Sequence, residues 1–227
     1  MVRCAAIIDE GQWQINQVAI CFCRYDIAKF SDQLFAQHNI DFPETIQKSV
    51  LKRQAEFFFG RHIARKSLKA LNIMQADIPI GEDHYPIWPA NTIGSISHTD
   101  SIVIACSQYL STKQYLGVDI EKVFDNKTYK EIKTFIINPD EADLLSDWQL
   151  SDRKGLTLAF SAKESLFKAI YPYLKFYLNF SDSNIIYIND RVVILAVSNE
   201  LAVQLNQQYF RCDYRLVGQY IVTLITT

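Results

Sequence analysis

Residues 160–169 read FSAKESLFKA, and the rest of the chain is organised around this stretch. Apolar side chains in and near it recur at helical spacing, which predicts a helix over residues 151–170 that ends before Pro172. The apolar positions are Leu156, Ala159, Phe160, Phe167 and Ile170. Glu164 and Lys168 are four residues apart, so their side chains share one helix face. Taken alone, they would form an ordinary ion pair, which contributes a few tenths of a kcal/mol.

An acidic strand precedes this helix in the chain. Apolar residues alternate there with Gly117, Asp119 and Glu121, the period-2 pattern of a half-buried strand. Alternation puts the two carboxylates on one face, about 6.5–7 Å apart along the strand. Mg²⁺ prefers such oxygen ligands and leaves positions for substrate phosphates. If the helix packs across the strand, Glu164 supplies a third ligand and Lys168 reaches the phosphates or the nucleophile, so the two motifs predict a site for phosphoryl chemistry.

Length, charge and cysteine content limit the class of protein. A chain of 227 residues is long enough for one large domain or two small ones. Its formal net charge of −2 produces no global field that would attract nucleic acid or an anionic membrane, and no segment reads as a membrane span. The five cysteines are scattered and form no zinc-ligand set, which favours buried free thiols in a reducing compartment. We expect a cytoplasmic protein without a nucleic-acid partner.

A basic helix is expected in the N-terminal part. Asp41 and Pro43 form a typical helix start, and the helical pattern continues to about Leu71. One face is apolar, and the other carries basic side chains against a single acid, Glu56. The basic residues are Lys48, Lys52, Arg53, Arg61, Arg65, Lys66 and Lys69. A solvated helix face is the commoner explanation of such a run, but arginine also binds phosphate through paired hydrogen bonds.

Ser97 and His98 lie at the end of a short predicted strand, where a polar turn begins. A histidine in this position is a surface or locally hydrogen-bonded residue about as often as a functional one. No nucleophile-elbow pattern accompanies it, so a Ser-His-Asp hydrolase is not indicated.

Strands and helices occur twice in a similar order, which predicts two lobes, residues 1–115 and 116–227. Within the first lobe, residues 9–11 (DEG) are typical of a turn between two strands. Within the second, Asn189 and Asp190 are typical of a hairpin turn.

Three motifs, in this order and spacing, resemble those of the 4'-phosphopantetheinyl transferases of the surfactin-synthetase and enterobactin-synthetase type. They are SISH at 95–98, GVDIE at 117–121 and FSAKESLFK at 160–168, with a gap of roughly 40 residues between the last two. The RQAEF…GR pattern at 53–61 and PIWP at 86–89 are similar to the enterobactin synthetase component D branch in particular. The resemblance covers over half of the chain.

The resemblance implies an α+β fold of two similar lobes related by a pseudo-twofold, each a small antiparallel sheet packed with a long helix, with the nucleotide in the cleft between them. It implies that Asp119, Glu121 and Glu164 hold Mg²⁺, or alternatively Mn²⁺, on the pyrophosphate of coenzyme A. Glu164 would also draw the proton from the acceptor serine, directly or through water. Lys168, with Lys163 alongside it, would stabilise charge on the pyrophosphate.

The resemblance further implies that Arg53, Arg61 and His98 bind the 3'-phosphate of coenzyme A, with Ser97 close to the nucleotide. The products would be a carrier protein bearing the phosphopantetheine arm and 3',5'-ADP. The enterobactin-like features favour carriers of siderophore or other nonribosomal-peptide synthesis, and the same type also serves fatty-acid carriers. We expect the enzyme to be a monomer. Residues 124–137 would meet the carrier protein, and their lysines would favour an acidic one.

Two other functions use the same residues. A Mg²⁺-dependent hydrolase of a nucleotide pyrophosphate would need the same carboxylates but no protein acceptor. A noncatalytic module would bind coenzyme A without turnover. Transfer of phosphopantetheine to a carrier serine distinguishes the transferase from both.

Overall fold

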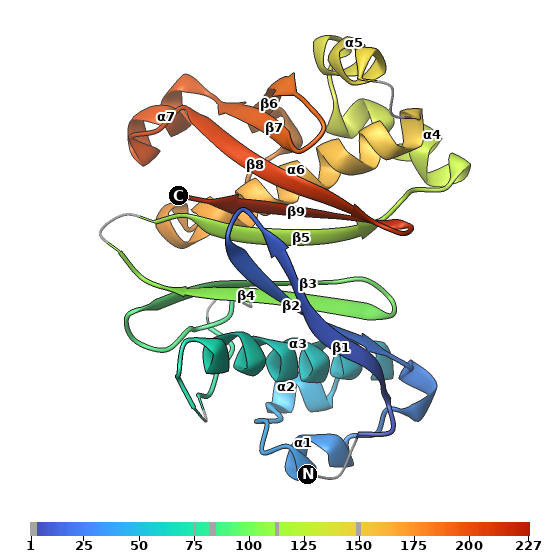
Figure 1. Cartoon of the computed structure of the whole chain (residues 1–227), viewed down its shortest axis with the longest axis vertical. Coiled ribbons are helices and arrows are strands. Elements are labelled where there is room, and N and C mark those ends of the chain that lie inside the picture. The colour runs from blue at the N-terminus through green and yellow to red at the C-terminus, as the bar shows by residue number, and fades with distance from the viewer. Residues whose placement is uncertain (1–3, 75, 82–84, 112–113, 149–150) are drawn as a thin grey trace. The chain divides into compact units, whose positions relative to one another are not determined.

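A computed structural model of the protein describes residues 4–74, 76–81, 85–111, 114–148 and 151–227. The chain divides into two compact units, Met1–Lys113 and Gln114–Thr227, whereas the boundary expected from the sequence lies after residue 115. Each unit contains one antiparallel sheet and one long helix, which confirms the predicted α+β class (Figure 1).

The sheet of the first unit has the strand order β1-β2-β4-β3. Its strands are β1 (Ile7–Ile15), β2 (Val18–Tyr25), β3 (Thr92–His98) and β4 (Ile102–Tyr109). The turn predicted at residues 9–11 is wrong, because these residues lie inside β1 and Gly11 pairs with Phe22 of β2. The turn falls instead at Asn16 and Gln17, whose φ angles of 42° and 64° are of the kind that tight hairpin turns require.

The described residues of the first unit include four helices, and the longest of them packs on the sheet (Figure 1). They are η1 (Ile27–Lys29), α1 (Gln33–Gln37), α2 (Glu44–Gln47) and α3 (Leu51–Ala70). The single long helix predicted here is interrupted before α3, because Val50 is extended with a ψ of 152°. The side-chain amide of Gln54 donates to the carbonyls of Gln47 and Ser49 and so satisfies backbone acceptors at the break. On the sheet side of α3, Phe59 is fully buried and its ring stacks on that of Tyr25 at 4.2 Å.

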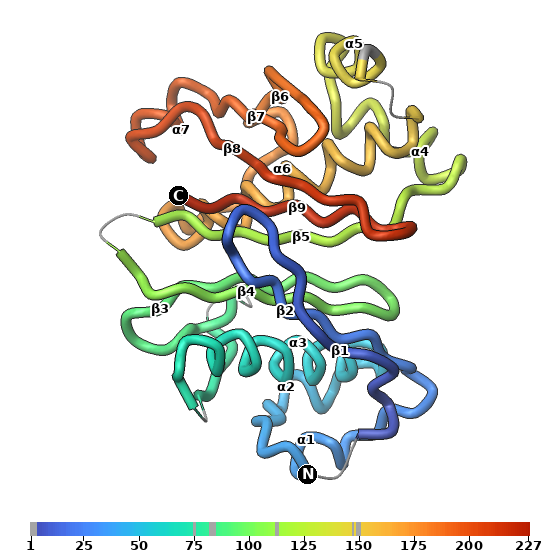
Figure 2. Tube along the Cα trace, in the orientation of Figure 1, coloured from blue at the N-terminus to red at the C-terminus, as the bar shows by residue number. Residues whose placement is uncertain are grey.

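The second unit contains a five-stranded antiparallel sheet of order β5-β9-β8-β7-β6. Its strands are β5 (Leu116–Lys122), β6 (Ser183–Ile188), β7 (Val192–Val197), β8 (Tyr209–Val217) and β9 (Tyr220–Thr226). The trace in Figure 2 shows β5 and β9 side by side. In the register of these two strands, Asp119 is opposite Thr223. The predicted hairpin turn between β6 and β7 is confirmed: the side chain of Asn189 accepts from the amides of Arg191 and Val192.

Helix α6 is the central helix of the second unit. The helices here are α4 (Asn126–Ile136), α5 (Pro139–Asp147), α6 (Asp152–Leu174), η3 (Phe180–Asp182) and α7 (Asn199–Leu205). The prediction that Pro172 ends α6 is wrong, since the helix continues to Leu174. A proline in the last turn removes a single backbone donor, and the helix stops instead where Lys175 adopts a left-handed φ of 60°.

Helix α6 packs on β5 and β9 with an almost entirely buried apolar face. Leu166, Ala169 and Ile170 join Ile221 and Ile225 in one core cluster. Burial of this face holds the helix on the sheet, because apolar area removed from water stabilises the folded state by roughly 25 cal/mol per Å². In the described part of the chain, no helix has the length and apolar character needed to cross a membrane.

Candidate active site

The odd-numbered face of β5 meets α6 at very short range. A Cβ placed on Gly117 would lie 2.0 Å from the carbonyl oxygen of Ser165 and 2.7 Å from the amide nitrogen of Ala169. Only a glycine permits this approach, so Gly117 determines how closely the helix lies on the strand. Since side chains alternate along a strand, Asp119 and Glu121 point to the same side as Gly117, toward α6.

Asp119 is buried, with only 2% of its surface exposed, and is held by two side chains of α6. The hydroxyl of Ser161 donates to its Oδ2 at 2.7 Å, and the ammonium of Lys168 donates to its Oδ1 at 2.6 Å. The predicted packing of the acidic strand against the FSAKESLFKA helix is therefore present. The charged side chain of α6 that is paired with Asp119 is that of Lys168.

Buried hydroxyl groups join α6 to β9 beside this carboxylate. The hydroxyl of Thr223 donates to the carbonyl of Ser161 and lies 2.9 Å from the Ser161 hydroxyl. The hydroxyl of Ser165 lies 2.6 Å from that of Thr223. The roles of Ser161, Ser165 and Thr223 were not predicted from the sequence. For the two serines of α6, the available signal was that small hydroxyl residues occupy the face of a predicted helix that must be buried.

Glu164 lies close enough to Lys168 and Asp119 for their charges to affect the pKa of its carboxyl group. Burial raises the pKa of its carboxyl group above 4.5, the positive charge of Lys168 opposes that rise, and the negative charge of Asp119 adds to it. Glu121, near the end of β5, is partly exposed. The second unit thus brings Asp119, Glu164 and Lys168 into one electrostatic neighbourhood, as predicted.

The expected metal triad is not assembled in this structure. Among the residues that the structure describes, no three His, Cys, Asp or Glu side chains are grouped so that they could hold a metal ion. The ammonium of Lys168 is paired with Asp119 instead. The oxygen-only donors Asp119, Glu121 and Glu164 still have the chemistry that a hard divalent ion requires.

Lys163 lies away from this neighbourhood, which corrects the expectation that it works alongside Lys168. Its side chain is 3% exposed and forms an ion pair with Glu141, at 2.8 Å between Nζ and Oε1. The two lysines point in different directions because five residues correspond to roughly 140° around a helix. Glu141 is a residue that the sequence analysis did not identify.

A cavity of about 270 Å³ opens beside Glu164 on α6. Aromatic and aliphatic side chains form most of its wall, and the ring of Tyr177, which is 70% exposed, stacks on that of Phe167. The lining residues are Lys163, Glu164, Leu166, Phe167, Tyr177, Leu178, Asn179, Phe180 and Ser183. The cavity can therefore accept a slender, partly apolar group next to the Glu164 carboxylate.

The first unit gathers its predicted cations around Glu56. Arg53 and His98 approach opposite oxygens of this carboxylate, each at 3.7 Å. Arg61 is 8% exposed; it donates to the carbonyl of Ile78 at 2.6 Å, and its guanidinium lies over the ring of Phe57. Burial lowers the pKa of Arg61 to about 10, and the charge of Arg53 adds to this effect, so the two guanidinium groups are near each other.

Ser97, the fourth predicted residue, lies in β3 directly before His98 and is 5% exposed. Arg53, Arg61 and His98 thus lie in one part of the first unit, with a partly exposed arginine and histidine beside a buried arginine. Glu56 lies beside both Arg53 and His98. The signal for it in the sequence was that it is the single acid among the basic residues of the predicted helix.

Comparison with known proteins agrees with these motifs. A family model described as the 4'-phosphopantetheinyl transferase superfamily matches residues 115–225, and one for the 4'-phosphopantetheinyl transferase N-terminal domain matches residues 42–107. The chain is 36% identical over 205 residues to Enterobactin synthase component D of Escherichia coli, which covers 89% of this chain and 90% of that protein.

A more distant relative and one solved structure also show similarity, but the family assignment rests on the family models and on the Escherichia coli relative. The chain is 31% identical over 150 residues to 4'-phosphopantetheinyl transferase PptT of Mycobacterium tuberculosis, covering 64% of this chain and 63% of that protein. A solved holo-[acyl-carrier-protein] synthase of Thermotoga maritima is similar at a TM-score of 0.37 and 18% identity, over 49% of this chain and 61% of that one. The chain therefore belongs to the 4'-phosphopantetheinyl transferases, in the branch of the enterobactin synthase component D type, and is an enzyme of that class.

Proposed function

We propose that the enzyme transfers the 4'-phosphopantetheine arm of coenzyme A to a serine of an apo carrier protein, with Mg²⁺ and with release of 3',5'-ADP. The serine oxygen forms a bond to the phosphorus that bears the pantetheine, and the bond from that phosphorus to the bridging oxygen breaks. The electron pair of this bond leaves with 3',5'-ADP, and the serine proton goes to a base. The observation that carries the proposal is the meeting of Asp119, Glu164 and Lys168 where β5 packs on α6.

Charge stabilisation is the main requirement of phosphoryl transfer, because the leaving group and the transferred group are both anionic. Lys168, partly exposed and one turn beyond Glu164, supplies a positive charge for the pyrophosphate. A divalent ion, when bound, would neutralise more of that charge, and Asp119, Glu121 and Glu164 would hold it. Lys168 would then exchange its contact with Asp119 for one with a phosphate oxygen.

Glu164 is the proposed base for the serine hydroxyl. Its environment raises the pKa of the carboxyl group, which makes the carboxylate a stronger base than an exposed one. The cavity beside it has apolar walls and a size that suit the pantetheine arm or the acceptor serine with its neighbours. Holding the hydroxyl in line with the phosphorus supplies the remaining rate advantage.

The 3'-phosphate of coenzyme A is proposed to bind in the first unit to Arg53 and His98, with Ser97 near the nucleotide. A phosphate there would compete with Glu56 for both cations. Arg61 is mostly enclosed and already donates to the carbonyl of Ile78. It would therefore add positive charge near the phosphate without donating a hydrogen bond to it. This modifies the expectation that all three cations contact the phosphate in the same way.

The acceptor is proposed to be a carrier domain of siderophore or other nonribosomal-peptide synthesis, as the name of the Escherichia coli relative suggests. Helix α4 offers a docking surface, because Phe135 is 75% exposed and Lys130 lies on the exposed side of the helix. An acidic carrier would be attracted by Lys130 and Lys133. Reversal of both charges should weaken carrier binding, and an unchanged affinity would argue against this surface.

Compartment and assembly follow from the same proposal. The free, buried thiols of all five cysteines suit the reducing cytoplasm. We expect the enzyme to act there as a monomer. Sedimentation of the purified protein at assay concentrations tests the oligomeric state.

One experiment tests the activity. The protein is incubated with coenzyme A, Mg²⁺ or Mn²⁺ and apo carrier proteins, and intact-mass spectrometry of the carrier is recorded. A mass gain equal to one phosphopantetheine arm, lost when the acceptor serine is changed to alanine and when the metal is chelated, is the expected result. Nucleotide release without a carrier would support a pyrophosphate hydrolase, and binding without turnover would support a noncatalytic module.

A further inference from the structure

Glu141 is almost completely enclosed, with 1% of its surface exposed, and its carboxylate binds groups both at the start of its own helix and in other segments. Its Oε2 accepts from the backbone amide of Asn138 at 3.0 Å, which closes the capping box at the start of α5. Its Oε1 accepts from the backbone amide of Ile185 in β6 at 2.8 Å. One carboxylate therefore joins the start of α5 to a strand 44 residues further along the chain.

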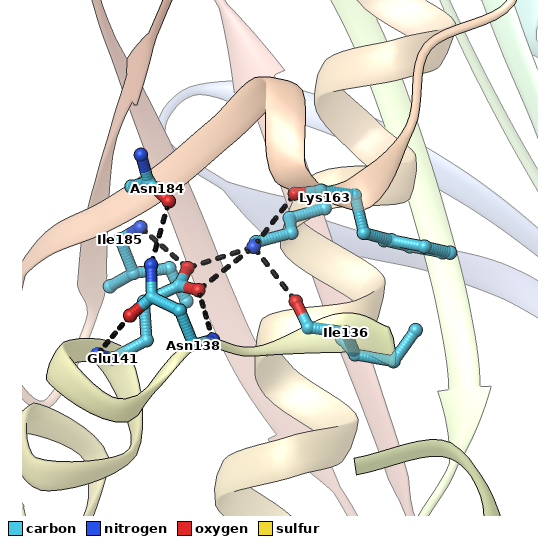
Figure 3. Close-up of polar contacts among 7 residues, drawn as sticks. Ile136, Asn138, Glu141, Lys163, Asn184 and Ile185 are labelled. Atoms are coloured by element: carbon cyan, nitrogen blue, oxygen red, sulfur yellow. Dashed lines mark hydrogen bonds and ion pairs between the residues drawn. The ribbon is translucent and has the colours of Figure 1, made fainter. Parts of the chain in front are cut away.

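Lys163 completes this cluster from α6. Its ammonium donates to the carbonyl of Ile136, the last residue of α4, at 2.8 Å and to the carbonyl of Phe180 in η3 at 3.0 Å. It also contacts both oxygens of Glu141, at 2.8 and 3.1 Å. Figure 3 shows the ammonium at the centre of these acceptors, with the side chain entering from α6. The three N–H groups of the ammonium thus have three protein partners, and five segments are held together.

The position of this cluster connects it to the proposed chemistry. Lys163 directly precedes Glu164, so a lysine held by Ile136, Glu141 and Phe180 also fixes the turn of α6 that presents the proposed base. Lys163 and Phe180, two members of the cluster, line the cavity beside Glu164. A shift of Lys163 would therefore move the base and the cavity wall together.

Stability alone does not explain why charged residues occupy this position. Removing two charges from water has a large unfavourable free energy, and well-packed apolar residues often serve a buried site equally well or better. What an ion pair with fixed backbone partners adds is direction, since each hydrogen bond has a preferred geometry. The cluster is therefore better suited to holding one arrangement of segments than to raising stability.

We propose that Glu141 is a positioning residue of this transferase and that it acts through Lys163, whose ammonium it keeps in place beside the Glu164 turn. The inference rests on the proposed role of Glu164. It assigns Lys163 to positioning instead of to contact with the pyrophosphate.

The test uses three variants of the full chain: Glu141→Gln, Lys163→Met and the double variant. Asp213→Asn is the matched control, because it breaks another ion pair of the same unit, the one between Asp213 and Arg211 on β8. For each protein, thermal unfolding is measured, together with kcat and the KM values for coenzyme A and for an apo carrier protein. Wild-type activity is established first, so that failure of the proposed function is recognised separately.

We expect the single variants to lose thermal stability and the double variant to regain much of it, since it leaves no uncompensated buried charge. The double variant should nevertheless keep kcat about ten- to a hundredfold below wild type, because misplacement by about 1 Å can reduce a rate 10²-fold. Its KM for coenzyme A should stay within about threefold of wild type, and Asp213→Asn should keep both constants.

Two results would overturn the inference. A double variant with wild-type kcat would mean that the pair is dispensable for positioning, and it would leave the proposed transferase activity intact. A large rise in the KM for coenzyme A of Lys163→Met, with little change in kcat, would return Lys163 to the role of a phosphate ligand. If the single variants do not fold, the double variant alone decides between these results.

Discussion

Lys163 and Lys168 of α6 each pair with a carboxylate, but the two pairs differ in how far solvent reaches them. Lys163 and Glu141 are both almost fully enclosed, at 3% and 2% side-chain exposure, and are surrounded by backbone hydrogen-bond partners. Lys168 pairs with the equally buried Asp119, but its own side chain is 25% exposed. We call the Lys163–Glu141 pair closed, because solvent hardly reaches either side chain. We call the Lys168–Asp119 pair open, because solvent reaches the lysine.

The difference shows how one short motif can serve two purposes. A closed pair cannot exchange partners without opening the structure, so it can only hold segments in place. When one residue of a pair is accessible, that residue can exchange its protein partner for a ligand at a much lower free-energy cost, because water and ligand reach it. We therefore assign the Lys163 side of α6 to structure and the Lys168 side to chemistry.

The largest effect is expected on activity at the open side. Glu164→Gln and Asp119→Asn should each lower phosphopantetheine transfer by about 10²–10⁴-fold, the typical contribution of acid–base and charge-stabilising groups. Intact-mass kinetics of the carrier protein measure this loss. The unfolding curve of Glu164→Gln should stay close to that of wild type, and transfer at near wild-type rate by this variant would remove Glu164 from the mechanism.

The next largest effect separates the two pairs by stability. Lys163→Met leaves Glu141 buried without its counter-ion and should reduce the free energy of unfolding by about 3–5 kcal/mol. Lys168→Met should reduce it by less, because the partly exposed lysine contributes less and the Ser161 hydroxyl still donates to Asp119. Denaturant unfolding of both variants measures the two losses in the free energy of unfolding. An equal or larger loss for Lys168→Met would contradict the difference between the two pairs.

A smaller effect concerns the contact that brings the open pair together. Gly117→Ala places a methyl group against the backbone of α6 and should destabilise the protein by about 1–3 kcal/mol while also lowering transfer. Gly155→Ala in the same helix is the control, because its added Cβ would meet Leu145 at an ordinary 3.6 Å and alanine favours a helix over glycine. If Gly117→Ala transfers at the wild-type rate, the close approach is not needed for the site.

The smallest effect is on pH dependence and again concerns the open side. Because burial raises the pKa of Glu164 in the folded protein, the folded state binds this proton more tightly than the unfolded chain does. The stabilisation is present at low pH and is lost as pH rises from about 4.5 through the folded-state pKa, so ionised Glu164 destabilises the protein at neutral pH. With metal chelated, Glu164→Gln should raise the neutral-pH Tm by less than about 4 °C, the shift that about 1 kcal/mol produces in a chain of this size.

The exposed Glu131 of α4 provides the control for this measurement, since Glu131→Gln should leave the pH profile of Tm unchanged. A Glu164→Gln variant with the same dependence of Tm on pH as wild type would show that the carboxyl group is not perturbed in the folded protein. The comparison between the two sides of α6 would then rest on geometry alone.

Several elements could be predicted from short-range patterns. Period-2 alternation located β5, helical spacing located α6, and the Asn189 turn located the β6–β7 hairpin. The turn at Asn16 and Gln17 was missed, because Gly11 looked like the stronger turn residue although it lies inside β1. Local propensity also placed the end of the predicted helix at Ile170, ahead of Pro172, whereas α6 continues to Leu174.

By itself, the sequence determined which residues carry charge and how they repeat along the chain, and this was sufficient for the fold class, the family and the Asp119–Glu164–Lys168 neighbourhood. Only the tertiary structure decided which partner each charge meets. Glu141 pairs with Lys163, and Glu56 lies beside Arg53 and His98. Asp119 pairs with the ammonium of Lys168. The physical reason is that spacing fixes the face of an element on which a side chain lies, whereas packing of other elements on that face fixes its burial and therefore its partner.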